Sequence, residues 1–470
     1  MNKLKPFSSI PGPRSWPIVG TLPYYFLKPC KKYDFKRLDR NGFLKYDEFG
    51  SIVRENIGPG VNILWLYDPE DIKKMFQYDG RCPARRSHLA LEKYRKDRPH
   101  LYNEGGLLPT NGEEWWRIRQ ALQRPLNISK SFENFHPSFG EIATEFVDSI
   151  NRTSDDFVED LKRYFLEITG FFTLDTRLGA MKEDNMDPDS IPSKLIKCAF
   201  QTNSNILITD NGPPLWKVFE TKEYKALRES RNYIENISLK FIRNKVNNLN
   251  TNPLSNNHLT LLDQYFVMDK LDEKDILTMV CDSLLAGIDT SSYTTGFMLY
   301  YLAKYPQVQA RLRETIHELP LDHNLKNFSF GRAVLKETLR LNPVSVGIGR
   351  ICQTSDAVFS GWSVPKGTVL VSQNQISCRL EKYFDRPHVF NPKRWMYKNQ
   401  NYHPYLVLPF GFGPRMCIGR RIAEMSILHL LIELLKKYEI KLKDPKLELG
   451  CISYLINSPD KPLQLELKRV

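Results

Sequence analysis

One stretch of ten residues constrains this chain more than any other. It runs from Phe410 to Gly419 and places Cys417 in a glycine-rich loop, with Arg415 two residues before the cysteine. Directly after the loop, apolar residues recur at helical spacing over residues 422–435. Glycines let a backbone wrap closely round a ligand sulfur and point N–H groups at it. The stretch therefore predicts a ligand-binding loop followed by a helix.

A thiolate held in such a loop can be the single axial ligand of a haem iron, where it favours O–O cleavage. Arg415 would then lie beside a haem propionate, because a planar charged donor suits a carboxylate. The pattern F-x-x-G-x-R-x-C-x-G is met at every fixed position, Phe410 and Gly419 included. It resembles the haem-binding loop of the cytochrome P450 superfamily. The resemblance implies a mainly helical fold with a small β region, in which haem b lies between a long central helix and Cys417.

Composition narrows the class of protein without naming a partner. The chain has 470 residues, of which 41% are hydrophobic and 26% charged, as in an ordinary globular protein. Its net charge of +13 favours acidic partners, although a solvated basic surface explains it too. We find no nucleic-acid motif and expect no nucleic-acid partner. The eight cysteines form no C-x-x-C pair, which favours a reducing compartment over a disulfide scaffold.

No proline-, glycine- or serine-rich linker divides the chain. We therefore expect a proline-rich segment over residues 1–23 and one domain over residues 24–470. The segment before the proline-rich turn at 10–13 consists of only nine, mostly polar residues. A membrane anchor at this place would need roughly 20 apolar residues. This predicts a soluble or matrix enzyme, or a chain whose targeting segment is missing.

Periodicity predicts helices over 113–126, 157–174, 224–249, 273–304 and 328–341, and a strand pair over 52–67. Short β patterns occur over 346–371, and flexible loops are expected over 183–192 and 247–257. Residues 39–48 resemble half of an EF-hand loop. The first carboxylate of such a loop is absent, so we interpret the segment as a polar turn.

A second motif, residues 286–291, lies inside the long apolar pattern. Gly287 costs a helix about 1 kcal/mol relative to alanine, so we expect the helix to open locally there. Asp289 and Thr290 could relay protons to dioxygen as general acid–base groups. The alternative is a core helix with a few outward polar residues. The motif resembles [AG]-G-x-[DE]-T-[TS] of the same superfamily, which favours the relay.

Glu337 and Arg340 share one face of a predicted helix, a spacing that usually marks a surface salt bridge. The resemblance instead implies a buried structural triad with Arg394 that supports the haem loop. Trp115 and Arg119 also share a helix face. By resemblance they hold a haem propionate together with Arg350.

The alternatives for these last three residues are a buried tryptophan and surface arginines. Trp116 leaves the choice of tryptophan open.

Arg332, Lys336, Arg420 and Arg421 form a candidate basic face. A solvated charge cluster is the ordinary explanation. The pair at 332 and 336 resembles that of mitochondrial cytochromes P450, which implies docking of an acidic two-iron, adrenodoxin-like ferredoxin served by an NADPH reductase. Complementary charge would make that encounter sensitive to salt.

Longer stretches resemble the arthropod Halloween family of ecdysteroid-synthesising enzymes, in particular its mitochondrial 22-hydroxylases. They are residues 65–69, 85–90, 94–96, 106–112, 341–347 and 404–409. The resemblance implies O2-dependent hydroxylation of carbon 22 of a steroid such as the ketotriol, by an enzyme on the matrix side of the inner mitochondrial membrane with peripheral membrane contact. It places the pocket walls at 87–103, 202–207, 283–286, 344–348 and 455–457.

Two other functions stay open. One is a mitochondrial enzyme of this superfamily that acts on another steroid position or a xenobiotic. The other is a haem-binding protein without turnover.

Overall fold

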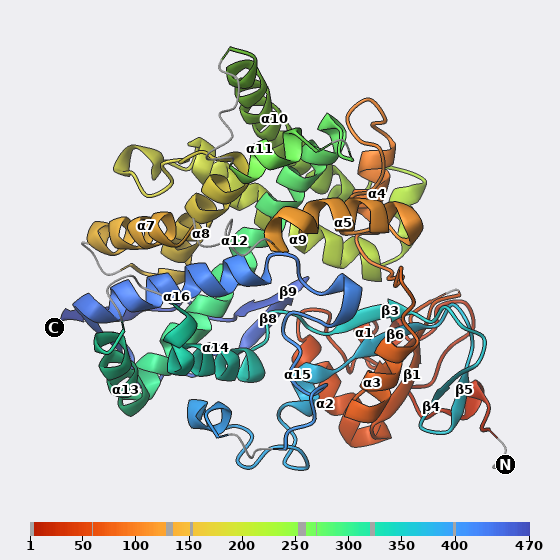
Figure 1. The fold of residues 1–470 in the computed structure, drawn as a ribbon. Helices are drawn as coiled ribbons and strands as arrows, with labels where there is room; N and C mark the ends of the chain where they lie inside the picture. Colours follow the sequence, from red (N-terminus) through yellow and green to blue (C-terminus); the bar gives the residue numbers. More distant parts are fainter. Residues whose placement is uncertain are drawn as a thin grey trace.

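The computed structural model describes residues 4–58, 60–127, 135–150, 154–251, 260–268, 270–319, 325–397 and 401–470. Helices dominate, and the strands form four small sheets. Figure 1 shows the helices of the middle of the chain above and the main sheet below, near the N-terminus. This confirms the expected mainly helical fold with a small β region. No helix of these residues is both long enough and apolar enough to cross a membrane.

The α-helices are α1 (Pro23–Phe26), α2 (Leu38–Phe49), α3 (Pro69–Gln77), α4 (Leu89–Lys96), α5 (Gly112–Asn127), α7 (Phe135–Ser149), α8 (Phe157–Leu174), α9 (Ile191–Asn211), α10 (Lys222–Thr251), α11 (Leu261–Phe266), α12 (Glu273–Lys304), α13 (Pro306–His317), α14 (Ser329–Leu341), α15 (Asn374–Ser377) and α16 (Arg420–Lys437). Short 3-10 helices are η1 (Phe7–Ser9), η2 (Glu183–Asn185), η3 (Pro214–Lys217), η4 (Leu325–Asn327), η5 (Pro392–Trp395) and η6 (Gly413–Arg415). The strands are β1 (Ile52–Asn56), β2 (Asn62–Leu66), β3 (Ile348–Ile351), β4 (Ala357–Phe359), β5 (Trp362–Val364), β6 (Val369–Ser372), β7 (Tyr438–Leu442), β8 (Cys451–Tyr454), β9 (Ile456–Pro459) and β10 (Leu465–Arg469).

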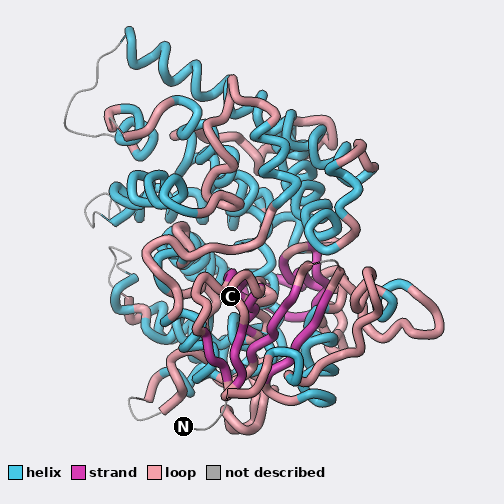
Figure 2. The backbone as a smooth tube through the Cα atoms, turned by 90° about the vertical axis from the view of Figure 1, so that its right-hand side faces the viewer, coloured by secondary structure: helices cyan, strands magenta, loops and turns pink. Residues whose placement is uncertain are grey.

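The largest sheet has the strand order β1-β2-β6-β3. Its first two strands are antiparallel, with Ile52 opposite Leu66, which confirms the strand pair predicted over 52–67. β6 joins β2 in parallel, so residues some 300 positions apart in the chain lie side by side. Figure 2 shows the strands gathered in the lower part of the molecule. The sheet thus fixes β3, which carries Arg350, in the same body as the N-terminal strands.

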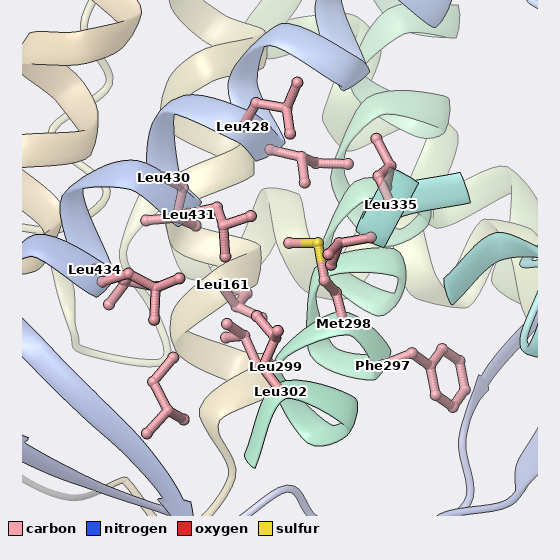
Figure 3. Close-up of a cluster of buried hydrophobic side chains, with 14 of the residues drawn as sticks. Leu161, Phe297, Met298, Leu299, Leu302, Leu335, Leu428, Leu430, Leu431 and Leu434 are labelled. Carbon is pink, nitrogen blue, oxygen red and sulfur yellow. The ribbon is translucent and has the colours of Figure 1, made fainter. Parts of the chain in front are cut away.

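The central helix α12 is buried over most of its length. It begins at a capping box, in which Asp272 and Asp275 each accept the other's backbone N–H. Leucines of α16 pack against it from one side and Leu161 of α8 packs nearby (Figure 3). Each fully buried leucine contributes about 1.5–3 kcal/mol. This core holds the start of α16, and with it the cysteine loop, at a fixed place.

The helices that were predicted from an apolar stripe agree with the structure. The bounds of α8 and α12 are those predicted, and α10 is longer by two residues at each end. The predicted loop over 183–192 contains η2 and the first residues of α9, a 21-residue helix that the sequence pattern did not reveal. Buried polar residues such as Thr202 and Thr209 obscure its apolar period. The other predicted loop is helical up to Thr251, and residues 252–259 lie outside the described ranges.

The polar turn predicted over 39–48 is wrong, because these residues form α2. The inward face of this helix is polar rather than apolar. Asn41 Nδ2 donates to the Asp34 carbonyl at 2.8 Å, and the buried Lys45 ammonium pairs with Glu55. A helix that is anchored by polar groups shows no apolar stripe in its sequence.

The N-terminal segment lies along the sheet. Lys5 N–H donates to the Gly361 carbonyl at 3.0 Å, and Arg54 N–H donates to the Pro11 carbonyl at 2.8 Å. The division at residue 23 stays a prediction.

Candidate functional site

The loop from Phe410 to Gly419 folds back on itself directly before α16. Cys417 N–H donates to the Phe410 carbonyl at 2.8 Å, and Met416 N–H donates to the Gly413 carbonyl at 3.0 Å. Gly411 and Gly413 have φ values of 76° and 72°, which non-glycine residues rarely adopt. Gly419 has an ordinary φ of −84° and precedes the first residue of the helix.

Burial and nearby donors act in opposite directions on the pKa of the Cys417 thiol. Its side chain is exposed, yet burial by the surrounding protein raises the pKa of the thiol. A side chain with both properties faces an enclosed space rather than the outer surface. The backbone N–H groups of Gly419 and Arg420 and the charge of Arg119 act in the opposite direction and lower its pKa. Such donors stabilise a metal-bound thiolate.

Ile418, the next residue of the loop, packs against a core cluster that contains Leu284, Leu285 and Ile288 of α12. The cysteine loop therefore borders the core that also buries the middle of the central helix. No group of three or more His, Cys, Asp or Glu in the described ranges could hold a metal ion. A single axial cysteine needs no such group.

Arg415 is held from several sides but not fully paired. Its guanidinium carbon lies 4.0 Å from the ring centroid of Trp115, and Nη2 donates to the Thr110 carbonyl at 2.7 Å and to Asn111 Oδ1 at 2.8 Å. Its Nη1 is buried and has no hydrogen-bond partner among the described residues. An additional acceptor is needed at this atom.

Positive charge collects round Arg415. Burial, and then repulsion from Arg85, Arg350 and Arg119, lowers the pKa of Arg415 to about 8, and only Asp79 among the named causes opposes this. These four arginines have only the Asp79 carboxylate named as a counter-charge, so a further anionic group is needed beside them. The two propionates of haem would provide that negative charge. The residues present therefore fit this cofactor.

The structure brings the other predicted cofactor residues to the same loop. Arg119 Nη2 donates to the Met416 carbonyl at 2.7 Å. Arg350 pairs with Asp79 at 2.7 Å, and its Nη2 donates to the Phe412 carbonyl at 3.2 Å.

Of the two neighbouring tryptophans, the buried Trp115 lies against Arg415, whereas the Trp116 ring lies 5.2 Å from the guanidinium carbon of Arg81. Arg85 belongs to the stretch 85–90, but sequence reasoning gave it no role at the cofactor; its Nε donates to the Leu108 carbonyl at 2.9 Å.

On α12, Ala286 is the one exposed residue beyond the first turn. The Thr290 hydroxyl donates to its carbonyl at 2.6 Å. The expected local opening is wrong, because the helix is continuous from Glu273 to Lys304. A Cβ at Gly287 would lie 2.7 Å from Thr169 Oγ1 of α8, so the glycine permits the close approach of two helices.

Asp289 is almost fully buried beside α9. Asn203 Nδ2 donates to its Oδ2 at 3.2 Å. Burial raises the pKa of Asp289 to about 6, against the opposing charge of Lys162 on α8. A carboxyl with this pKa can give and take a proton near neutral pH. Asn203 lies in the segment 202–207 that was expected to wall the pocket, but neither its contact with Asp289 nor the charge of Lys162 was indicated by the sequence.

Glu337, Arg340 and Arg394 meet in the core. Glu337 accepts from Arg340 Nε and Nη2 and from Arg394 Nε, each at 2.9 Å. Trp395 Nε1 also donates to it at 2.9 Å, and Asn391 N–H donates at 3.0 Å. One carboxylate thus ties α14 to the segment around η5. Motif reasoning identified the two arginines and missed the other two donors.

The predicted basic face is assembled in part. Burial, and then repulsion from Arg420, lowers the pKa of Lys336, so α14 and α16 present these charges close together. Arg332 lies one turn before Lys336 and donates to the Leu325 carbonyl at 2.8 Å. Arg421 is exposed next to Arg420, which pairs with Glu424 at 3.0 Å.

Comparison with known proteins agrees with this arrangement. A family model described as Cytochrome P450 matches residues 10–466. The chain is 42% identical to "Cytochrome P450 302a1, mitochondrial" of Drosophila melanogaster, over 99% of this chain and 96% of that protein. It is 32% identical to "Probable cytochrome P450 12b2, mitochondrial" and 29% identical to "Probable cytochrome P450 301a1, mitochondrial" of the same species, over 90% and 99% of this chain and 84% and 87% of those proteins.

Proposed function

We propose that this chain, which belongs to the cytochrome P450 family and is a haem-thiolate monooxygenase, hydroxylates a steroid, specifically carbon 22 of an ecdysteroid precursor such as the ketotriol. The observation that carries the enzyme class is the cysteine loop with its cluster of arginines. The similarity to the mitochondrial 302a1 protein and the stretches shared with the Halloween family support the substrate.

The cofactor is haem, held by a cysteine thiolate in this family. We assign the thiolate to Cys417, and the propionates to Arg415, Trp115, Arg119 and Arg350. When bound, haem supplies the activation of O2 and the transfer of one oxygen atom to a C–H bond. Phe410 and Gly419 shape the loop round the sulfur. By resemblance to the family, the triad of Glu337, Arg340 and Arg394 supports this loop.

The proton supply falls to Asp289 and Thr290. Asp289 can hold a proton at Oδ1, since Oδ2 accepts from Asn203 Nδ2, and can release it near neutral pH. Thr290 lies at the next position of α12, and its hydroxyl oxygen can accept a proton while its hydrogen is donated to Ala286. Neighbouring residues of a helix do not face each other, so in this proposal a water molecule bridges the two groups.

The electron donor in this proposal is an acidic two-iron ferredoxin with its NADPH reductase. Lys336 and Arg420 lie close together, and Arg332 and Arg421 extend the positive surface along the same two helices. Charges exposed in this way accelerate association with an acidic partner and lose that effect at high salt.

The proposed location is the matrix side of the inner mitochondrial membrane. Each of the three relatives bears the word mitochondrial in its name. Large apolar side chains are exposed around α1 and around η3, where they could enter the interfacial region of a bilayer. These residues are Ile18, Val19, Phe26 and Leu27 in the first group and Leu215, Val218 and Phe219 in the second.

Reconstitution with defined redox partners tests the proposal. The purified holoenzyme is given the ketotriol, NADPH and either a mitochondrial ferredoxin with its reductase or a microsomal flavoprotein reductase. We expect a single 22-hydroxylated product, identified by mass spectrometry and NMR, with the ferredoxin system only. A product hydroxylated elsewhere would favour another steroid hydroxylase, and turnover of xenobiotics alone would favour the detoxifying alternative. Binding of haem without any turnover would favour a non-catalytic protein.

A further inference from the structure

An open hollow of about 280 Å³ lies where the end of the β1–β2 hairpin meets residues 15–18 of the N-terminal segment. Arg54 and Asn56 are two residues apart on β1, and Asn62 stands opposite Asn56 on β2, so their side chains share one face of the hairpin. None of the residues that line the hollow is acidic, and none belongs to the candidate haem site.

The hollow is lined by hydrogen-bond donors that have no acceptor. The guanidinium of the half-buried Arg54 lies 5.9 Å from the ring centroid of Phe7 and has no hydrogen-bond or ion-pair partner among the described residues. Its Nε is buried, whereas its outer nitrogens remain reachable. The Trp16 indole N–H is also without a partner in the described ranges, and so is the amide nitrogen of Asn62, whose Oδ1 accepts from Asn56 at 3.2 Å. One cation and two neutral donors without a carboxylate fit an anion that accepts several hydrogen bonds.

An apolar tip stands beside the hollow. Trp16 and Gly20 exchange both backbone hydrogen bonds, at 2.9 and 3.0 Å, and so close a tight turn. At the end of this turn Ile18 is 82% exposed and Val19 is 44% exposed. Ile18 also has a φ of 65°, which a β-branched residue rarely adopts. An apolar phase against the tip would remove both side chains from water.

The tip and the hollow together determine the kind of anion. A soluble anion would fill the hollow and leave the tip in water, whereas a phospholipid surface presents phosphate groups directly above apolar chains. Tryptophan, with its apolar ring and polar N–H, is enriched at that boundary. A guanidinium binds two phosphate oxygens at once. The net charge of +13 adds a general attraction to an anionic surface.

We propose that Arg54, Trp16 and Asn62 bind the phosphate of an anionic phospholipid while Ile18 and Val19 enter the bilayer beside it. A choline headgroup would bring a second cation close to Arg54, so the site prefers a lipid with a net negative charge. This inference goes beyond the proposed reaction, and it gives the proposed membrane contact a defined binding site.

Vesicle binding tests the site. The holoenzyme is sedimented with vesicles of phosphatidylcholine alone and with vesicles of equimolar phosphatidylcholine and phosphatidic acid. Wild type should bind the mixed vesicles more tightly, and Arg54→Gln should weaken that binding by about tenfold or more. The control Arg40→Gln makes the same charge change at an exposed position of α2 and should weaken it by less than about threefold. Equal weakening in the two variants would mean diffuse charge attraction and overturn the site.

Two further variants separate the site from the tip and from a folding defect. Ile18→Ser should weaken binding to both kinds of vesicle by a similar factor and keep the preference for the mixed vesicles. The Tm of Arg54→Gln should equal that of wild type, because the guanidinium makes no hydrogen bond to the described residues. If the Tm falls, Trp16→Phe removes one donor and keeps an aromatic ring. It should weaken binding to the mixed vesicles alone, by about fivefold, and unchanged binding would overturn the proposal.

Glycerol 3-phosphate distinguishes a lipid from a soluble phosphate ester. It carries the phosphate without apolar chains and should not release wild type from the mixed vesicles at constant ionic strength. Release of wild type by this compound would identify a soluble ester as the ligand and overturn the lipid assignment. If wild type binds neither kind of vesicle, the lipid site and the proposed membrane contact both fail, whereas hydroxylation in the reconstituted system is decided separately.

Discussion

At the scale of single residues, burial sets the properties of the charged groups at the site. It lowers the pKa of Arg415 to about 8, because burial and the neighbouring arginines disfavour its charge, and it raises the pKa of Asp289 to about 6. The two shifts have different uses in this account. Arg415 requires an anion beside it, whereas Asp289 can give and take a proton in the proposed relay.

The loop cysteine carries the first prediction. Cys417→His keeps a possible metal ligand and removes the thiolate, so the reduced carbon monoxide complex should lose its thiolate-type absorption while haem is still bound. Hydroxylation should fall below detection. The same substitution at Cys82, a partly exposed cysteine outside the loop, serves as the control. A retained thiolate-type spectrum in the Cys417 variant would contradict the assignment.

Asp289 predicts a pH dependence of stability. Its folded-state pKa of about 6 exceeds the ordinary 3.8, so the folded protein binds this proton more tightly than the unfolded chain does. Its contribution to stability is present below pH 4 and is lost as the pH rises to about 6, at a cost of about 3 kcal/mol. Between pH 4 and pH 7 the free energy of unfolding of the Asp289→Asn holoenzyme should therefore fall by about 3 kcal/mol less than that of wild type, as measured by urea unfolding. Identical pH profiles would refute this.

Motifs in the sequence predicted most residues of the candidate site. The remaining residues were found only from contacts in the folded structure. The residues of the cysteine loop and the 286–291 stretch stand at fixed spacings, so the sequence alone picked them out. The contacts of Arg85, Asn203 and Lys162 arise only through the fold, because Arg85 precedes α4 and the other two lie on α9 and α8, far from α12 in the sequence.

At the scale of elements, close helix packing explains what sequence reasoning assigned to chemistry. Gly287 was expected to open α12, and instead it lets α8 approach. Gly287→Ala should cost about 1–3 kcal/mol of unfolding free energy, because the stiff Thr169 side chain must move. Adding Thr169→Ala should recover most of this loss, as measured in a double-mutant cycle. Strict additivity of the two substitutions would show that the contact is not the cause.

The ties between α14 and η5 give a second prediction about elements. Glu337→Gln leaves Arg340 and Arg394 buried without their counter-charge, and the free energy of unfolding should fall by about 3–5 kcal/mol. Glu314→Gln breaks an exposed pair with Arg311 and should cost less than about 1 kcal/mol. Equal effects of the two substitutions in urea unfolding would argue against a buried structural role for the triad.

At the scale of the whole molecule, exposed basic side chains of α14 and α16 lie close together. The double variant Lys336→Ala, Arg420→Ala should slow association with a two-iron ferredoxin by about tenfold at low salt, since complementary charges steer the encounter. The difference from wild type should shrink as the ionic strength rises. Stopped-flow kinetics measure both effects. Lys366→Ala, an exposed lysine between β5 and β6, is the matched control, and an equal effect there would contradict a localised docking face.

The fold as a whole was predictable in outline for a physical reason. Helices such as α8 and α12 could be predicted from the helical spacing of their apolar residues, and the first strand pair from its alternation of apolar and polar residues. α2 and α9 could not, because polar groups anchor α2 and buried polar residues interrupt the apolar face of α9. Elements stabilised by specific polar contacts become visible only when their distant partners are known.

An isotope experiment tests the central claim most directly. The holoenzyme, with ferredoxin and its reductase, is given ketotriol that carries two deuterium atoms at carbon 22, under an atmosphere of ¹⁸O2. The account predicts a product that has lost one deuterium and gained one ¹⁸O atom at that carbon. A product that retains both deuterium atoms, or whose new oxygen derives from water, would contradict it.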